Sequence, residues 1–132
     1  MRFVESRISY GFEEGCTSDK KEDVAETFDI LAEKTPLQFY LSGDSEILIS
    51  CSELAPEAGR GKRYFVAGEG GPTEIINTTL FSVIKKGTIS LYRDEKCSTP
   101  HIALHEILHV LGFDHNQNPK SILYPTLDCK QV

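Results

Sequence analysis

The stretch HEILHVLGFDH, residues 105–115, holds three of the four histidines in this chain. His105 and His109 lie four positions apart, so a helix would present both imidazoles on one face, one turn from each other. Gly112 can adopt a positive φ angle that other residues resist, which would turn the chain back and bring His115 to the same point. The spacing therefore predicts three imidazoles around one metal ion.

Three neutral imidazoles suit Zn²⁺, and a tetrahedral ion with three protein ligands keeps its fourth position for water. Glu106 stands beside His105, where its carboxylate can accept a proton from that water. A buried helix with incidental histidines is the simpler interpretation. However, the pattern H-E-x-x-H-x-x-G-x-x-H specifies five residues at fixed spacing and rarely arises by chance. The motif therefore predicts a hydrolytic zinc site.

The residues before the motif predict where its helix begins. Thr99 is the expected N-cap, and Pro100 is expected at the first helical position. Apolar residues from Ile102 to Leu111 are spread around most of the circumference, so the helix should be largely buried. His101 lies one turn before His105, and we expect it on the helix surface rather than as a fourth ligand.

The rest of the sequence alternates strand-like and helix-like segments. Apolar residues at helical spacing before Pro36 predict an amphipathic helix over residues 19–36, with Val24, Phe28 and Leu31 on its buried face. Short apolar and β-branched runs predict strands at residues 7–12, 36–41, 46–51, 73–78 and 87–93. The glycine-rich residues 55–73 are expected to form an irregular surface segment with one short strand inside it, or a plain solvent loop.

Length and charge limit the class of protein. A chain of 132 residues fits a single domain, 1–132, with its own core. The formal net charge is -6 and no run of Lys or Arg is long enough to mark a nucleic-acid footprint or an anionic-membrane patch, so neither is an expected partner. The apolar runs are shorter than a bilayer requires, which predicts a soluble chain.

The four cysteines bear on the compartment. Cys16, Cys51, Cys97 and Cys129 never form a C-x-x-C pair, which argues against a zinc ribbon or a thioredoxin-like redox site. Two disulfides would place the protein in an extracellular or secreted location. Free, mostly buried thiols in a cytoplasmic protein are the alternative, because an even count alone does not decide between them.

At this point the sequence resembles a known family. HEILHVLGFDH matches the extended zinc signature of the metzincin metallopeptidases, and SILYP, residues 121–125, lies where their Met-turn is expected. Residues 21–40 and 46–51 resemble the first helix and the next two strands of a matrixin-like catalytic domain. The resemblance implies an α+β, metzincin-like (zincin) domain. Its twisted five-stranded mixed sheet would have one antiparallel edge strand, a backing helix and the active-site helix.

The resemblance also implies roles for individual residues. His105, His109 and His115 would bind one catalytic zinc ion, and Glu106 would act as general base and acid of a zinc metalloendopeptidase. Residues 73–78 would form the cleft-edge strand that pairs with an extended peptide or protein substrate. The segment from Pro125 to Leu127 would border the pocket for the residue after the scissile bond. We expect a monomer.

Two positions depart from the family pattern. Leu123 stands where the family has the methionine of its turn, and this near-isosteric exchange should cost little because that side chain packs without binding the metal. The sequence after the turn leaves little or none of the family's C-terminal helix. Tyr124 directly precedes Pro125, which favours a packing role over contact with the metal.

The matrixin-like topology also selects a cysteine pairing. The strands that Cys16 follows and Cys51 ends would be parallel neighbours, so these two cysteines would pair. Cys97 precedes the active-site helix and Cys129 follows the turn beneath it, which leaves them as the second pair.

Two other functions stay open. LHVLGFDH also resembles the three-histidine signature of a small bacterial metalloprotein family implicated in ribosomal RNA maturation, a metal-dependent endoribonuclease-like alternative. That family lacks a glutamate at the place of Glu106. The other alternative is a zinc-holding, inactive peptide-binding module, for which Leu123 and the short C-terminal part are the support.

Overall fold

The computed structural model describes residues 2–52, 68–92, 95, 97–125 and 128–131. Within them the chain forms two helices, α1 (Ser18–Lys34) and α2 (His101–Val110). The strands are β1 (Arg2–Phe3), β2 (Arg7–Phe12), β3 (Gln38–Leu41), β4 (Ile47–Cys51), β5 (Gly68–Asn77) and β6 (Ser82–Leu91). No helix in the described ranges is both long and apolar enough to cross a bilayer.

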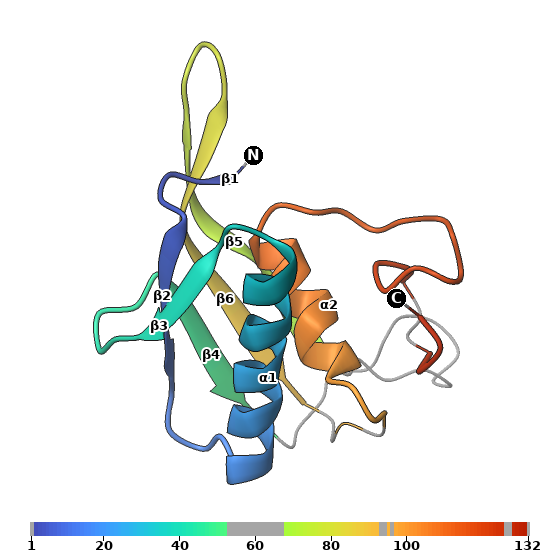
Figure 1. Cartoon of the computed structure of the whole chain (residues 1–132). Helices are drawn as coiled ribbons and strands as arrows, with labels where there is room; N and C mark the ends of the chain where they lie inside the picture. Colours follow the sequence, from blue (N-terminus) through green and yellow to red (C-terminus); the bar gives the residue numbers. More distant parts are fainter. Residues whose placement is uncertain (1, 53–67, 93–94, 96, 126–127, 132) are drawn as a thin grey trace.

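The strands form one mixed sheet. Its order is β1-β6-β4-β2-β3, with β5 paired to β6, and only the β5–β6 pair among those described is antiparallel. Both helices lie on the same side of the sheet (Figure 1). The expected mixed sheet with two helices is confirmed, but the described residues form six strands rather than the five expected. The addition is β1, whose two residues pair with Val83 and Ile84 and are too few to leave a sequence pattern.

The core lies between the sheet and the two helices. The strands contribute aliphatic side chains that are essentially inaccessible to solvent, namely Ile8, Ile47, Ile49, Ile84 and Ile89. The helices contribute Val24, Phe28, Leu31, Ala103, Ile107 and Val110. The predicted buried face of the first helix is therefore confirmed. Full burial of one such side chain contributes about 1.5 to 3 kcal/mol, so this layer dominates the stability of the fold.

Helix α1 is defined by local signals at both ends. The hydroxyl of Thr17 accepts a hydrogen bond from the backbone N–H of Lys20 at 3.3 Å, which makes Thr17 the N-cap. The helix ends at Lys34, because the residue before Pro36 is disfavoured from helical backbone angles. The predicted range, 19–36, is thus close to the observed one.

Strand β5 begins inside the glycine-rich segment, where one short strand was expected. Gly68 to Pro72 pair with β6, from Gly68 opposite Leu91 onward, and a register shift follows between Pro72 and Glu74; residues 55–67 lie outside the described part. A Cβ built at Gly70 would lie 2.7 Å from the carbonyl oxygen of Glu106, and one built at Gly68 would lie 3.1 Å from the Glu106 Cγ. The glycines therefore let the strand lie directly against α2. Strand β6 begins at Ser82, five residues before the predicted start at residue 87.

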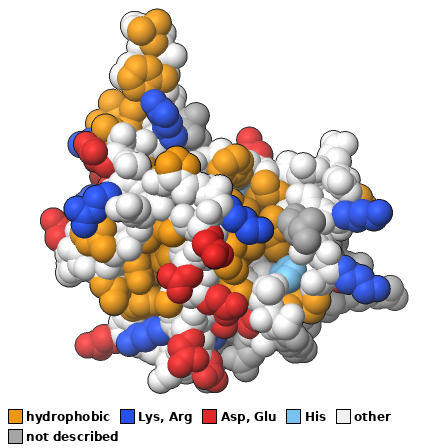
Figure 2. Space-filling view, viewed as in Figure 1, with side chains coloured by type: hydrophobic (Ala, Val, Ile, Leu, Met, Phe, Trp, Pro, Cys, Tyr) orange, Lys and Arg blue, Asp and Glu red, His pale blue; other side chains and the backbone are white. Residues whose placement is uncertain are grey.

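The β5–β6 hairpin projects beyond the body of the molecule (Figure 1). Its turn is closed by Thr78, whose hydroxyl accepts from the backbone N–H groups of Leu80 and Phe81 at 3.3 Å and 3.0 Å. Leu80 is 88% exposed and Phe81 is 60% exposed. Figure 2 shows the resulting hydrophobic surface at the tip.

Two disulfides join the pairs implied by the family resemblance. Cys16 bonds to Cys51, at the same ends of the parallel neighbours β2 and β4. Cys97 bonds to Cys129 and links the approach to α2 with the end of the described chain. Sequence separations of 35 and 32 residues correspond to a stabilisation of roughly 4 kcal/mol each in the chain-entropy account.

The contact of β5 with α2 generates a stability prediction. We expect Gly70→Ala to lower the free energy of unfolding by about 1 to 3 kcal/mol, because the new methyl group meets backbone that cannot rotate away. Gly71→Ala is the matched control, since a Cβ there meets nothing within 4 Å. Urea denaturation of both variants measures the difference. Equal stability of the two would contradict this packing.

Candidate metal centre and active site

The end of α2 is closed by Gly112. Its φ angle is +108°, its N–H donates to the carbonyl of His109 at 3.0 Å, and the N–H of Phe113 donates to the carbonyl of Leu108 at 3.0 Å. This pair of bonds is the Schellman arrangement, in which a glycine with positive φ reverses the chain. The predicted turn at Gly112 is confirmed, and it carries the chain from His109 towards His115.

The beginning of α2 differs from the prediction. The N-cap is Pro100, without a side-chain cap, and Thr99 lies one residue outside the helix. Glu95 provides the missing acceptor, because its carboxylate accepts from the N–H of Ile102 at 2.8 Å and from that of Cys97 at 3.3 Å. A carboxylate at this end also complements the helix dipole. Nothing in the sequence marks a residue seven positions upstream as a cap.

The three predicted ligands are brought together. The Nε2 atoms of His105 and His109 lie 3.0 Å apart. The ring of His115 lies 4.6 Å from that of His109 and 5.4 Å from that of His105, measured between centroids. One nitrogen from each residue can be chosen so that all lie within 4.8 Å of one another. His105 is buried, His109 half-buried and His115 exposed, so the cluster opens to solvent on one side.

Hydrogen bonds to main-chain carbonyls determine which nitrogens face the cluster. The Nδ1 of His105 lies 2.6 Å from the carbonyl oxygen of Ile122, and the Nδ1 of His109 lies 2.7 Å from that of Phe113. A carbonyl can only accept, so each neutral imidazole carries its proton on Nδ1 and presents a bare lone pair at Nε2. Two lone pairs 3.0 Å apart repel each other unless a cation lies between them. The donor set therefore fits a metal ion.

Burial keeps the first of these ligands neutral. Desolvation lowers the pKa of His105, the hydrogen bond to Ile122 opposes this shift, and the neighbouring imidazoles of His109 and His115 lower it further. A neutral imidazole is the form that binds a metal.

Glu106 is enclosed by α2 and β5. It is 6% exposed, and Gly68 and Gly70 lie against it. Burial, with a smaller contribution from Glu69, raises the pKa of Glu106 to about 7. A carboxyl group with this pKa takes up and returns a proton near neutral pH, as a general base and acid requires.

The turn after the histidines approaches α2 through its main chain. The N–H of Leu123 donates to the hydroxyl of Ser121 at 3.1 Å, and its carbonyl accepts from Asn116 at 2.9 Å. Leu123 and Tyr124 are half-buried and Pro125 is exposed, whereas residues 126 and 127 of the expected pocket border lie outside the described part. The sequence analysis missed Ile122, which is buried and whose carbonyl holds His105.

The prediction that His101 lies on the helix surface was wrong, because it is only 5% exposed. Its two ring nitrogens contact Thr99 and the main-chain carbonyl of Gln131 instead of the histidine cluster. A polar residue in an apolar helix gives no signal of burial when its partner lies thirty residues away.

The Gly112 turn generates a second prediction. Gly112→Ala should lower the free energy of unfolding by about 1 to 2 kcal/mol or more, because a side chain at positive φ is strained. The same change should weaken metal binding, since the turn places both the Phe113 carbonyl and His115. Gly43→Ala is the control, at an open position without positive φ. Thermal unfolding and metal titration measure both effects, and an unaffected Gly112→Ala variant would contradict the assignment.

Comparisons with known proteins show the family to which the chain belongs. The chain is 30% identical over 135 residues to the macrophage metalloelastase of Oryctolagus cuniculus, which covers 90% of this chain and 27% of the relative. It is 28% identical over 114 residues to the zinc metalloproteinase nas-14 of Caenorhabditis elegans, covering 86% of this chain and 19% of the relative. The chain thus spans less than a third of the length of either relative. The sequence model of the family described as Matrixin matches residues 4–132, so the chain belongs to the matrixin family.

Proposed function

We propose that residues 1–132 form a single catalytic domain of a zinc-dependent endopeptidase. The observation that carries the proposal is the pair of bare Nε2 atoms 3.0 Å apart, beside a buried carboxyl group on the same helix. Membership of the matrixin family and the printed names of the two relatives, a metalloelastase and a zinc metalloproteinase, support it.

His105, His109 and His115 would hold one zinc ion. When bound, zinc supplies a Lewis acid that lowers the pKa of a water molecule and polarises a carbonyl group. The chain's own part is orientation, because the Ile122 and Phe113 carbonyls keep two of the imidazoles in the ligating tautomer. The exposed side of the cluster, at His115, leaves room for water and substrate.

Glu106 would move the proton. Its carboxylate would accept a proton from the attacking water and return it to the leaving amine, as its raised pKa of about 7 allows. The apolar wall around it, formed by α2 and the glycines of β5, keeps bulk water from competing for that proton.

Strand β5 would bind the substrate along Gly68–Gly70, which lie against Glu106, whereas the sequence analysis expected residues 73–78 to form the cleft edge. It pairs with β6 on one side, and among the described residues no strand pairs with its other side. An extended peptide can add to such an edge through main-chain hydrogen bonds. Because Gly68 and Gly70 bring β5 against Glu106, a peptide on this edge would pass the proposed catalytic carboxyl group. Leu123, Tyr124 and Pro125 would border the pocket next to the scissile bond.

The disulfides support an extracellular or secreted location, where an oxidising environment preserves them. We propose a monomer that acts on peptides or proteins. The net charge of -6 does not favour an RNA substrate.

The zinc proposal predicts one equivalent of metal per chain. After dialysis against zinc, elemental analysis should give a ratio near one, and His109→Ala should weaken the affinity by at least about 100-fold, because one of three ligands is lost. Circular dichroism of the variant checks that it is folded. A ratio near zero for the native chain, or unchanged affinity in the variant, would refute the site.

The role of Glu106 predicts separate effects on binding and turnover. Glu106→Ala should keep its zinc and lose hydrolysis by a factor on the order of 10² to 10⁴, the contribution of a positioned general base. Products from a mixed peptide library, identified by mass spectrometry, measure the rates. Glu33→Ala, at an exposed position of α1, is the control.

The outcomes separate the alternatives. Unchanged turnover in Glu106→Ala would remove Glu106 from the mechanism. A native chain that holds zinc and binds peptides without cutting them would be an inactive binding module.

A further inference from the structure

We propose that His101 and Gln131, two buried residues outside the metal cluster, are positioning residues for it. They hold the loop whose Ile122 carbonyl orients His105. The inference rests on the proposed function, because it concerns the affinity of the same histidines for metal. It assigns a role to the fourth histidine, which the zinc motif does not use.

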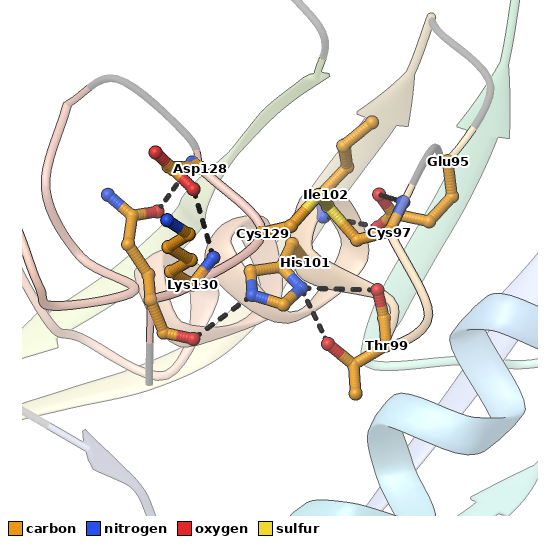
Figure 3. The surroundings of a disulfide bond; sticks show 9 residues. Glu95, Cys97, Thr99, His101, Ile102, Asp128, Cys129 and Lys130 are labelled. Carbon is orange, nitrogen blue, oxygen red and sulfur yellow. Dashed lines mark hydrogen bonds between the residues drawn. A yellow bond between two sulfur atoms is a disulfide. The ribbon is translucent and has the colours of Figure 1, made fainter.

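His101 joins the start of α2 to the end of the described chain. Its Nε2 lies 3.0 Å from the carbonyl oxygen of Gln131, and its Nδ1 lies 2.6 Å from the hydroxyl of Thr99 (Figure 3). Because a carbonyl only accepts, Nε2–H is the donor to Gln131, while Nδ1 lies within hydrogen-bond distance of both the hydroxyl and, at 3.2 Å, the carbonyl of Thr99. Both His101 and Gln131 are about 95% buried, at 5% and 4% exposure, so water cannot easily replace the bond.

Gln131 extends this contact into the loop. Its side-chain Nε2 donates to the carbonyl of Pro119 at 3.1 Å, and its Oε1 accepts from the N–H of Asp128 at 2.9 Å. One buried side chain thus connects two parts of the C-terminal segment, while its own carbonyl is held by His101. The nearby Cys97–Cys129 disulfide fastens the same segment covalently (Figure 3).

From Pro119 the chain turns towards the histidine cluster, and hydrogen bonds close this turn. The N–H of Ser121 donates to the carbonyl of Asn118 at 2.9 Å, and the hydroxyl of Ser121 accepts from Leu123. Between them, the carbonyl of Ile122 accepts from His105 at 2.6 Å. The described residues after α2 contain no helix or strand, so these contacts hold the loop in place.

Loss of the His101–Gln131 bond would remove one of the contacts that hold this segment, beside the Cys97–Cys129 disulfide, and would loosen the Ile122 carbonyl against His105. The imidazole could then carry its proton on Nε2, the atom that must be bare to bind metal. A group that hydrogen-bonds a ligand directly, as the Ile122 carbonyl does, typically changes metal affinity by roughly 10-fold to 100-fold.

The test compares His101→Leu, which removes the donor at similar volume, with His101→Gln, which restores an N–H towards Gln131. Long-range ¹H–¹⁵N spectra of the metal-free protein report the tautomer of His105, and competition with a chelator reports the zinc affinity. His101→Leu should mix the two tautomers of His105 and weaken zinc binding by roughly 10-fold to 100-fold. His101→Gln should return both readouts to within about 3-fold of the native chain, or about 0.7 kcal/mol.

Phe39→Leu controls for a general loss of stability, because Phe39 stacks on Phe28 at 4.3 Å, among the aromatic residues of α1 and β3. It should leave the tautomer and the zinc affinity unchanged. If His101→Leu does not fold, Gln131→Met removes the links to Pro119 and Asp128 while keeping the carbonyl that His101 contacts, and the same two changes are expected.

A native tautomer together with native zinc affinity in folded His101→Leu, or in folded Gln131→Met, would overturn the proposal. So would equal losses in His101→Leu and Phe39→Leu, since that result assigns His101 a merely structural role. If the native chain binds no zinc, the proposed function fails, but the tautomer of His105 in the metal-free protein still decides whether His101 positions it.

Discussion

Two hydrogen bonds from imidazole Nδ1 atoms to main-chain carbonyls constrain the rest of this structure. They leave the Nε2 lone pairs of His105 and His109 facing each other at 3.0 Å. Each carbonyl comes from a segment with its own requirements. Phe113 must follow a glycine with positive φ, and Ile122 must be carried back to α2 by a loop without regular secondary structure. The candidate metal centre therefore depends on the two segments that follow its helix.

The sheet acts on the site through the close approach of its backbone to α2 rather than through side chains. At Gly68 and Gly70 atoms of Glu106 lie too close to leave room for a Cβ, so the backbone of β5 lies directly against Glu106. At Gly87 a Cβ would come within 2.5 Å of Val110, so β6 approaches the same helix in the same way. A carboxyl group enclosed like this loses water, and its pKa rises. The glycines thus connect the packing of the fold to the proton chemistry proposed for Glu106.

Local patterns in the sequence predicted the parts of the fold that local physics determines. The strand at residues 7–12, the buried face of α1 and the turn at Gly112 depend on near neighbours, and all three are found. The cap by Glu95, the burial of His101 and the carbonyl of Ile122 depend on partners far along the chain. Every residue has a carbonyl, so no pattern marks the one that orients a ligand. The cysteine pairs could be predicted because the family resemblance supplied the order of the strands.

The described residues after α2, 113–125 and 128–131, show how a segment without helix or strand is kept in one place. Hydrogen bonds within a helix repeat with the chain, whereas these residues rely on individual contacts: the Ile122 carbonyl, the side chain of Gln131 and one disulfide. In the described residues no buried side-chain nitrogen or oxygen lacks a hydrogen-bond partner, so this polar segment carries no desolvation penalty from unmade bonds. Such individual contacts are easier to lose than the hydrogen bonds of a helix, where neighbouring bonds of the same kind hold the backbone in place. The orientation of His105 is therefore the property of the site that a distant substitution can change most readily.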